Sequence, residues 1–491
     1  MRDESVDTIL AERFGLERLR PLQARIVDRL LAGGDAFVVM PTGSGKSLCY
    51  QLPALVHAAR RRAAGDAPGC TLVFSPLIAL MEDQVASLRA RGIEAQSINS
   101  TLDRKERERR YRKVGRGDYE LIYATPERMH KPEFVQALKD LPGGVNLLAV
   151  DECHCITKWG HDYRPAYQEV GDFARQVGAP PTVALTATAT PLVRQDVWAT
   201  LGSDPESMPL FASGIDRPNL RLEVRQAWDD DAKAQQIHAL AEAWPGTGIV
   251  YFSLIKHLDR FAARLRAEGV PGELLVYHGK LDAREKKRVY DRFIGARPEE
   301  RLLLLATNAF GMGVDKADIR FLIHAEVPGS IEAYYQEVGR AGRDGEPSMC
   351  ALLYSEDDLA VQQQFVEWAN PGADLLRDAA HALEQRAHTD LTADDLRELV
   401  VGRDRGDRRA EACLITLGKL GVIEPGPIPE HWRFVRPLRR GELDVEALAD
   451  KRTRDLTRLL DVVTLVRTDD LRGYLLDYFG LDRDSVSTGH E

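Results

Sequence analysis

A glycine-rich segment carries residue types that suit phosphate chemistry. The run VVMPTGSGKSLCY, residues 38–50, ends an apolar stretch and opens a helical pattern, so its backbone N–H groups would point at an anion. Lys46 would supply a positive charge to the outer phosphates, and the Ser47 hydroxyl suits Mg²⁺. The full P-loop pattern has a glycine where Met40 stands. The predicted phosphate-binding set is Thr42, Gly43, Ser44, Gly45, Lys46 and Ser47.

A second segment, residues 149–167, allows two kinds of chemistry. Its sequence AVDECHCITKWGHDYRPAY would bind zinc if Cys153, His154, Cys155 and His161 converged. Structural zinc sites commonly draw their ligands from two separated pairs, whereas three of these residues are consecutive, so the spacing disfavours zinc. The alternative is that an apolar strand delivers two acids at its carboxyl end, where parallel sheets bind ligands. There Asp151 would hold Mg²⁺, and Glu152 would orient or deprotonate the attacking water.

A third segment could complete a nucleotide site from a second domain. The run YYQEVGRAGRDG, residues 334–345, follows an apolar strand and carries Gln336, Arg340 and Arg343. The two arginines are three residues apart and are expected to share one helical face. An arginine that crosses a cleft would neutralise charge on the γ-phosphate when two domains close. Alone, this stretch would also fit a helix whose arginines pair with surface acids.

The chain is long enough to position these segments on separate domains. It has 491 residues, 44% hydrophobic and 29% charged, and its six cysteines do not form a disulfide framework. We expect a cytoplasmic protein, since no membrane span or secretory signal is apparent, and the net charge of −10 neither indicates nor excludes DNA as a partner. Apolar runs alternate with helical patterns, which predicts α/β domains with parallel sheets. The expected strands are 36–40, 71–75, 121–124, 147–150 and 182–187 in one series and 248–253, 273–278, 301–307 and 321–327 in another.

The domain boundaries follow from breaks in this alternation. We expect one α/β domain at 1–205, a second α/β domain at 206–356 and a mainly helical third unit at 357–491. In the third unit Thr392 would cap one helix, residues 407–424 would contain a second, and 431–435 a strand. Helix, helix and strand is the order of a winged-helix unit. Its basic face would comprise Arg405, Arg408, Arg409, Arg433, Arg436, Arg439 and Arg440, with Trp432 as a strand-separating wedge; a helical cap with arginines paired to acids is the alternative.

With these motifs in order, the sequence resembles superfamily-2 DExH helicases and, within them, the RecQ family. The resemblance runs from FGLERLRPLQ (14–23) to GRAGRDG (339–345), and its most specific part is DECHCITKWGHDYRPAY. It implies that the domains at 1–205 and 206–356 are tandem RecA-like domains, the first of them ATP-binding. It also implies ATP and Mg²⁺ as cofactors and DNA as substrate. It also implies that Arg20 and Gln23 contact adenine, that Asp315 lies in the nucleotide cleft and that His154 links the nucleotide state to DNA.

The same resemblance implies which residues track a nucleic-acid strand. Three segments of the first domain fit this role, around Ser75, Thr101 and residues 124–128, and the TATAT segment with Thr186 and Thr188 would couple hydrolysis to movement. The loop after DECH carries types that stack on bases or bind phosphate. These are Trp159, His161, Tyr163 and Arg164. Core packing is the alternative for the aromatic residues of this loop.

Two departures from the RecQ pattern carry predictions. Leu16 stands where the family usually has an aromatic that stacks on adenine, so selectivity for ATP over other nucleotides would be relaxed. The family usually has a four-cysteine zinc module after its last motif, but only Cys350 and Cys413 follow here, and Asp470 falls where a cysteine is expected. We therefore predict no structural zinc.

The function expected from the sequence is ATP-dependent 3′ to 5′ DNA unwinding on a substrate with a 3′ tail, in DNA repair or recombination. A DNA-dependent translocase or ATP-switched clamp that does not unwind is the first alternative, and an RNA-dependent DExH ATPase is the second.

Overall fold

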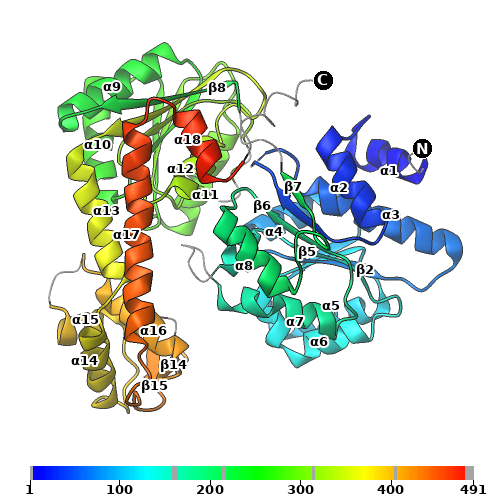
Figure 1. Ribbon diagram of the computed structural model, residues 1–491. Coiled ribbons are helices and arrows are strands. Elements are labelled where there is room, and N and C mark those ends of the chain that lie inside the picture. Colours follow the sequence, from blue (N-terminus) through cyan, green and yellow to red (C-terminus); the bar gives the residue numbers. More distant parts are fainter. Residues whose placement is uncertain are drawn as a thin grey trace.

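The chain folds into two α/β domains and a helical tail (Figure 1). The computed structural model describes residues 4–41, 43–157, 164–212, 217–311, 314, 316–402, 406–428 and 430–481. We name residues 4–212 domain 1, residues 217–354 domain 2 and residues 355–481 the tail. The two predicted parallel-sheet domains are confirmed. No helix within these described ranges is long and apolar enough to cross a membrane.

Domain 1 is built on a seven-stranded sheet in which every pairing is parallel. Phe37 and Phe74 face one hydrophobic cluster while Val38 and Val73 face another, so both faces of the sheet are buried. This explains the continuous apolar runs in the sequence. In spatial order the strands are β3 (Ala95–Ile98), β4 (Leu121–Ala124), β2 (Cys70–Phe74), β5 (Val145–Val150), β6 (Thr182–Thr186), β1 (Ala36–Val39) and β7 (Leu210–Ala212).

Helices cover both faces of this sheet. They are α1 (Glu4–Phe14), α2 (Pro21–Leu31), α3 (Leu48–Ala64), α4 (Ile78–Ala90), α5 (Arg104–Arg116), α6 (Pro132–Lys139), α7 (Val170–Gln176) and α8 (Pro191–Leu201). Three short 3₁₀ helices, η1 (Pro126–His130), η2 (Cys153–Ile156) and η3 (Pro165–Glu169), shape loops at the strand ends.

Domain 2 repeats the arrangement with a six-stranded parallel sheet. Its spatial order is β10 (Glu273–Tyr277), β11 (Leu302–Ala306), β9 (Thr247–Tyr251), β12 (Ile319–His324), β13 (Ser348–Tyr354) and β8 (Leu220–Gln226). Its helices are α9 (Asp230–Ala243), α10 (Ile255–Glu268), α11 (Ala283–Ile294) and α12 (Ile331–Val338).

The tail consists of a two-helix stalk that carries a small unit at its far end (Figure 1). The stalk pairs α13 (Glu356–Ala369) with α17 (Val445–Arg467), and Lys451 Nζ donates to the carbonyl of Ala369 at 3.2 Å and to Asn370 Oδ1 at 2.8 Å. The small unit is inserted between these helices. It contains α14 (Ala373–Glu384), α15 (Ala393–Val400), α16 (Arg409–Lys419), β14 (Ile423–Pro425) and β15 (Trp432–Phe434). The last helix among the described residues is α18 (Leu471–Tyr478).

The small unit has the element order of a winged helix. Thr392 caps α15 as the sequence predicts, accepting a hydrogen bond from the backbone N–H of Asp395 at 3.2 Å. A β-bridge between Leu391 and Trp432 extends the antiparallel β14–β15 ribbon. A Cβ added at Gly418 of α16 would lie 3.2 Å from the indole of Trp432, which therefore packs on the small core. The interpretation of Trp432 as a free wedge is not supported.

Several arginines of the expected basic face are paired with acids. Arg409 and Asp407 approach to 2.6 Å, Arg433 and Asp390 to 3.3 Å, and Arg436 also pairs with a carboxylate, that of Glu442. Arg405 lies outside the described residues. The pairing reduces the positive potential that the small unit can present to DNA.

Helix α18 connects the tail to both domains. Arg472 donates to the carbonyls of Arg217 and Leu220 at the start of domain 2, and the ring of Phe479 lies 5.2 Å from that of Tyr335 on α12. On the domain 1 side, Arg194 of α8 donates to the carbonyls of Phe479 and Gly480. Helix α18 and the two residues that follow it thus form an additional physical link between the domains.

Candidate active site

The glycine-rich loop joins β1 to α3, with Ser47 immediately before the first helical residue. Gly43 and Gly45 have φ angles of +78° and +84°, in the left-handed region that side chains disfavour, so glycine is required for this bend. Lys46 Nζ donates to the carbonyl of Met40 at 2.9 Å, which holds its ammonium group within the loop. The loop therefore presents a helix N-terminus and a cation to the same space, as a phosphate site requires.

Arg20 and Gln23 brace this loop from the N-terminus of α2. Gln23 Nε2 donates to the carbonyls of Ser44 and Gly45 at 3.1 and 3.3 Å, and Arg20 donates to the Ser44 carbonyl at 3.2 Å. Both residues thus lie beside the phosphate loop, and their contact with adenine stays a prediction. Leu16, which departs from the family pattern, precedes Arg20 by four residues in the sequence and is 42% exposed.

The two acids follow β5 at the carboxyl end of the sheet. Glu152 adopts a left-handed φ of 48°, which turns the chain sharply between the strand and η2. Burial first, and the neighbouring Glu152 second, raise the pKa of Asp151 to about 7, against the lowering influence of Lys46. A buried carboxyl with a raised pKa is a group that a cation would stabilise in its charged form. Asp151 and Ser47 therefore fit a divalent metal held between loop and strand.

A polar chain leads from these acids to the TATAT segment. His154 Nδ1 lies 3.2 Å from Glu152 Oε2 and 2.9 Å from Thr186 Oγ1. Thr186 Oγ1 in turn donates to the carbonyl of Thr188 at 3.0 Å and accepts from its N–H at 3.2 Å. The structure thus brings together the acid and the residues that the resemblance associates with coupling.

Domain 2 reaches the phosphate loop through Arg343. A Cβ added at Gly43 would lie 2.7 Å from Arg343 Cδ, so the arginine side chain lies directly against the loop. Arg340 is buried and donates to the carbonyl of Gly311, while Arg343 donates to that of Val314 at 2.9 Å. The prediction that Arg340 and Arg343 share a helical face is wrong, because α12 ends at Val338 and both arginines belong to the turns that follow. Backbone carbonyls, rather than a helix, orient them.

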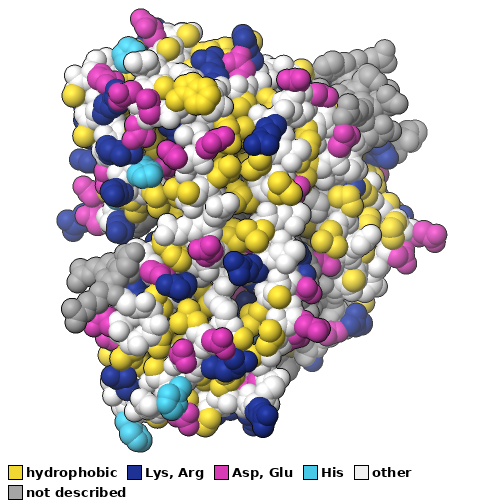
Figure 2. Space-filling model, turned by 60° about the vertical axis from the view of Figure 1, so that its left-hand side comes forward, with side chains coloured by type: hydrophobic (Ala, Val, Ile, Leu, Met, Phe, Trp, Pro, Cys, Tyr) yellow, Lys and Arg dark blue, Asp and Glu magenta, His cyan; other side chains and the backbone are white. Residues whose placement is uncertain are grey.

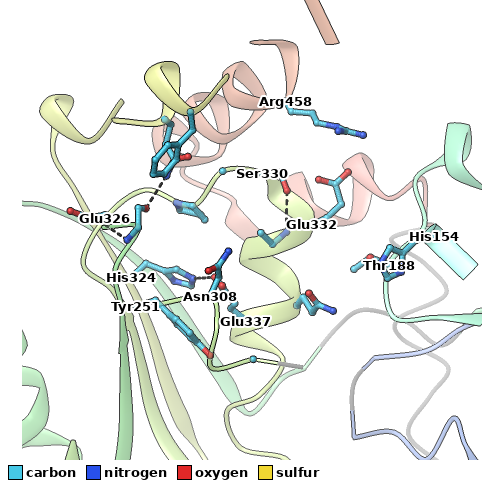
Figure 3. Close-up of a pocket in the computed structure, with 18 of the residues that line it drawn as sticks. His154, Thr188, Tyr251, Asn308, His324, Glu326, Ser330, Glu332, Glu337 and Arg458 are labelled. Carbon is cyan, nitrogen blue, oxygen red and sulfur yellow. Dashed lines mark hydrogen bonds and ion pairs between the residues drawn. The ribbon is translucent and has the colours of Figure 1, made fainter. Parts of the chain in front are cut away.

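A cleft of about 430 Å³ separates the domains beside this site (Figure 3). In the close-up, His154 and Thr188 lie on the domain 1 side, facing α12 with Glu332 and Glu337, while Arg458 reaches in from α17. Gln336 lines the same cleft. No sequence pattern pointed to Arg458, because its helix is distant in the chain and only the tail's return alongside domain 2 places it there.

The other wall of the cleft contains a polar cluster that motif reasoning missed. Glu326 accepts the backbone N–H of Ser253 at 2.6 Å and pairs with His257, and Gln362 of the stalk donates to Ser253 Oγ at 2.9 Å. Ser253 and His257 follow β9 and Glu326 follows β12, so for these three the general rule that ligands bind at the carboxyl ends of parallel strands was the available signal.

The expected nucleic-acid contacts of domain 1 lie at the carboxyl ends of neighbouring strands. Ser75 follows β2 and is buried, and Thr101 lies beyond β3, where its N–H and hydroxyl both donate to Asn99 Oδ1. Arg164 lies 3.6 Å from Glu127 beyond β4. The remaining predicted residues fall outside the described part of the chain: Thr42, Trp159, His161, Tyr163 and Asp315.

Known proteins with sequences similar to this chain are helicases. A family model described as DEAD/DEAH box helicase matches residues 20–196, and one described as helicase conserved C-terminal domain matches residues 232–345. The probable ATP-dependent DNA helicase RecS of Bacillus subtilis (strain 168) is 37% identical over 416 residues, which are 84% of this chain and 79% of the relative. This chain belongs to the RecQ family of ATP-dependent DNA helicases.

Other RecQ-family relatives are longer than this chain. The ATP-dependent DNA helicase RecQ of Bacillus subtilis (strain 168) is 40% identical over 363 residues, 73% of this chain but 58% of the relative. Among solved structures, the DUF1998 helicase MrfA bound to DNA superposes with a TM-score of 0.58 at 18% identity, covering 88% of this chain and 62% of that one. The latter similarity concerns the fold.

Proposed function

We propose that this RecQ-family chain couples ATP hydrolysis to 3′ to 5′ movement along single-stranded DNA and to separation of the duplex ahead of it. The observation that carries the proposal is the approach of Arg343 in domain 2 to Gly43 in the phosphate loop of domain 1. A nucleotide bound there would be contacted by both domains, so its hydrolysis would change how they sit together.

The residues of domain 1 would bind and activate the nucleotide. Lys46 would leave the Met40 carbonyl for the outer phosphates, and Ser47 with Asp151 would hold Mg²⁺, which supplies charge neutralisation when bound. Glu152 would position the attacking water and accept its proton. Arg343 and Arg340 would stabilise the charge that develops on the γ-phosphate, since phosphoryl transfer depends mainly on positioning and electrostatics.

Coupling to DNA would pass through His154. Its ring contacts both Glu152 and Thr186, so a shift of the TATAT segment would alter the position of the acid. The loop that contains Trp159, His161 and Tyr163 follows His154 in the chain, and bases stacked on it would bias the same histidine. Alternate tightening of the two domains on the strand would then give directional movement.

The decisive experiment measures ATP-driven separation of a short duplex with a 3′ single-stranded tail. The same duplex with a 5′ tail tests polarity, and Lys46→Ala tests dependence on the phosphate site; we expect its hydrolysis to fall by at least about 100-fold. The proposal is supported if the unaltered chain opens the 3′-tailed duplex but not the 5′-tailed one, and Lys46→Ala opens neither. Equal opening of both duplexes, or hydrolysis near the normal rate in Lys46→Ala, contradicts it.

One observation favours a second candidate, a DNA-dependent translocase that does not unwind. Trp432 packs against α16 and the small core, so the small unit offers no free aromatic wedge at that position. In that case DNA would stimulate ATP hydrolysis while neither tailed duplex opens. Stimulation by RNA rather than by DNA of equal length would instead indicate the RNA-dependent alternative.

A further inference from the structure

Helix α5 carries a concentration of positive charge that the nucleotide site does not use. Its thirteen residues, RKERERRYRKVGR, include eight Lys or Arg and two Glu, in a chain whose net charge is −10. Figure 2 shows that on the face with domain 2 and the small unit acidic and basic side chains are interspersed. The charge of α5 is therefore a local feature and not a property of the composition.

Four of these side chains form a stripe along one helical face. Lys105, Arg109, Arg112 and Arg116 are spaced by four, three and four residues, so they project in nearly the same direction over about 16 Å. The opposite face is anchored, because Tyr111 and Val114 are buried. We name these four residues the α5 stripe.

The stripe is only partly neutralised. Arg109 forms a bidentate pair with Glu106 at 2.7 and 2.8 Å. Lys105, Arg112 and Arg116 are exposed, and no carboxylate within the described ranges lies in ion-pair distance of them. Like charges three or four residues apart destabilise an isolated helix, so the arrangement does not serve helix stability.

The position of α5 identifies what the stripe faces. β3 is the outermost strand of the domain 1 sheet, and α5 begins three residues after Thr101, at the carboxyl end of that strand. A nucleic-acid strand that crosses the carboxyl ends of β2, β4 and β3, in that spatial order, would leave domain 1 at the start of α5. The stripe then continues the same path down the side of the domain.

A shallow groove runs beside the stripe, between α5 and α6. Arg112 and Arg116 line one wall, whereas Glu133 and Asp140 stand on the α6 side, where Gln136 Nε2 donates to Asp140 Oδ1 at 2.7 Å. The carboxylates repel an anion from the α6 wall and so confine a phosphate backbone to α5.

We propose that the α5 stripe is an additional binding surface for the phosphate backbone of single-stranded nucleic acid, holding the strand where it leaves domain 1. This inference rests on the proposed function, because the path over β2, β4 and β3 belongs to it. Backbone contacts of this kind are independent of base sequence and depend strongly on salt.

The test compares the unaltered chain with Lys105→Gln/Arg112→Gln/Arg116→Gln. A matched control, Arg175→Gln/Arg266→Gln/Arg452→Gln, removes three exposed arginines elsewhere and changes the net charge by the same amount. Binding of oligo-dT of about 8 and about 25 nucleotides is measured as a function of salt. For the long oligonucleotide we expect the stripe variant to bind on the order of 10- to 100-fold more weakly at 0.1 M salt, with a log–log salt slope shallower by about 2.

The short oligonucleotide separates this inference from the proposed function. It should bind the stripe variant and the unaltered chain equally, because the contacts over the sheet use its whole length and none of it reaches the stripe. Failure of the unaltered chain to bind either length overturns the proposed function. Equal binding of the long oligonucleotide to the unaltered chain, the control and the stripe variant overturns the inference about the stripe alone.

Discussion

Replacement of Arg194 by methionine tests whether the tail ties the two domains together. Arg194 is 8% exposed, and its guanidinium donates to three backbone carbonyls: that of Ala189 within domain 1 at 3.1 Å, that of Gly480 at 3.3 Å, and that of Phe479. Burial lowers the pKa of this guanidinium, so the charge is retained in an unfavourable setting for the sake of these contacts. Methionine keeps much of the volume and removes every donor.

The magnitude follows from the number of bonds lost. A hydrogen bond from a charged group contributes a net of about 1.5–3 kcal/mol, but bonds made by one side chain are not additive, and the variant is relieved of burying a cation. Two of the three bonds cross to the tail, so we expect the link to weaken by about 3 kcal/mol. That corresponds to a loss of roughly 100-fold in the population of the tied arrangement.

The assay measures the distance between the domains. All six native cysteines are buried, so single cysteines introduced at the exposed positions Glu12 of α1 and Arg266 of α10 can carry spectroscopic labels. We expect a single narrow distance distribution in the labelled chain and a broad one after Arg194→Met. Arg175→Met, which removes an exposed arginine of α7 from the same domain, should leave the distribution narrow.

An unchanged distribution in Arg194→Met would refute the reasoning, because it would mean that α18 is held by domain 2 alone. Broadening in Arg175→Met as well would show that any loss of arginine from domain 1 loosens the pair, and the specific role of the buried guanidinium would then be wrong.

Three further predictions address the loop, the core and the metal content. Gly43→Ala should reduce ATP hydrolysis, because its Cβ would meet Arg343 Cδ at 2.7 Å; Gly33→Ala, at φ +82° with open space around it, should lose similar stability to backbone strain yet keep hydrolysis. Lys233→Met should destabilise domain 2 by about 3–5 kcal/mol in denaturant melts, because it leaves Asp358 buried without its 2.6 Å partner, and Lys233→Met/Asp358→Asn should recover part of that loss. Burial raises the pKa of Asp358 to about 6, so its neutral form is more favoured in the folded than in the unfolded chain. At pH 5 Asp358 can be neutral and needs no cation, so the loss of stability in Lys233→Met should be smaller at pH 5 than at pH 8. A loss of stability that does not depend on pH would contradict this. Metal analysis of chelator-free protein should find far less than one zinc per chain, since the two cysteines beyond domain 1 lie in separate hydrophobic clusters; stoichiometric zinc would overturn this prediction.

Every apolar run that the sequence assigned to the two sheets coincides with a strand, because strands buried on both faces are continuously apolar. Two edge strands, β3 with the sequence AQSI and β8 with LRLEVRQ, were missed because edge strands need less apolar surface. β13, with the sequence SMCALLY, was missed as well, although it lies inside the second sheet and all of its residues are buried. β7 belongs to the first sheet although it lies beyond the expected boundary at residue 205.

The candidate site shows the same division between local and distant information. The loop around Lys46 and the two acids after β5 are local sequence patterns, so the strand that precedes each of them could be predicted from the sequence. The contacts of Arg343 with the loop, and of Arg458 with the cleft, depend on how distant segments pack. Spacing along the chain also misled for Arg340, where the helix ends two residues earlier than the pattern requires.

The insertion of the small unit between α13 and α17 makes it a removable module. Its entry and exit points are close, since Asn370 contacts both Lys451 and Asp455 of the returning helix at 2.8 and 2.9 Å. A few flexible residues in place of about the segment 371–447 would therefore span the gap between α13 and α17, and would expose apolar side chains of the stalk such as Leu448 that pack on the small unit. Both sheets and α18 lie outside this segment, so the path of the chain through them does not depend on the small unit.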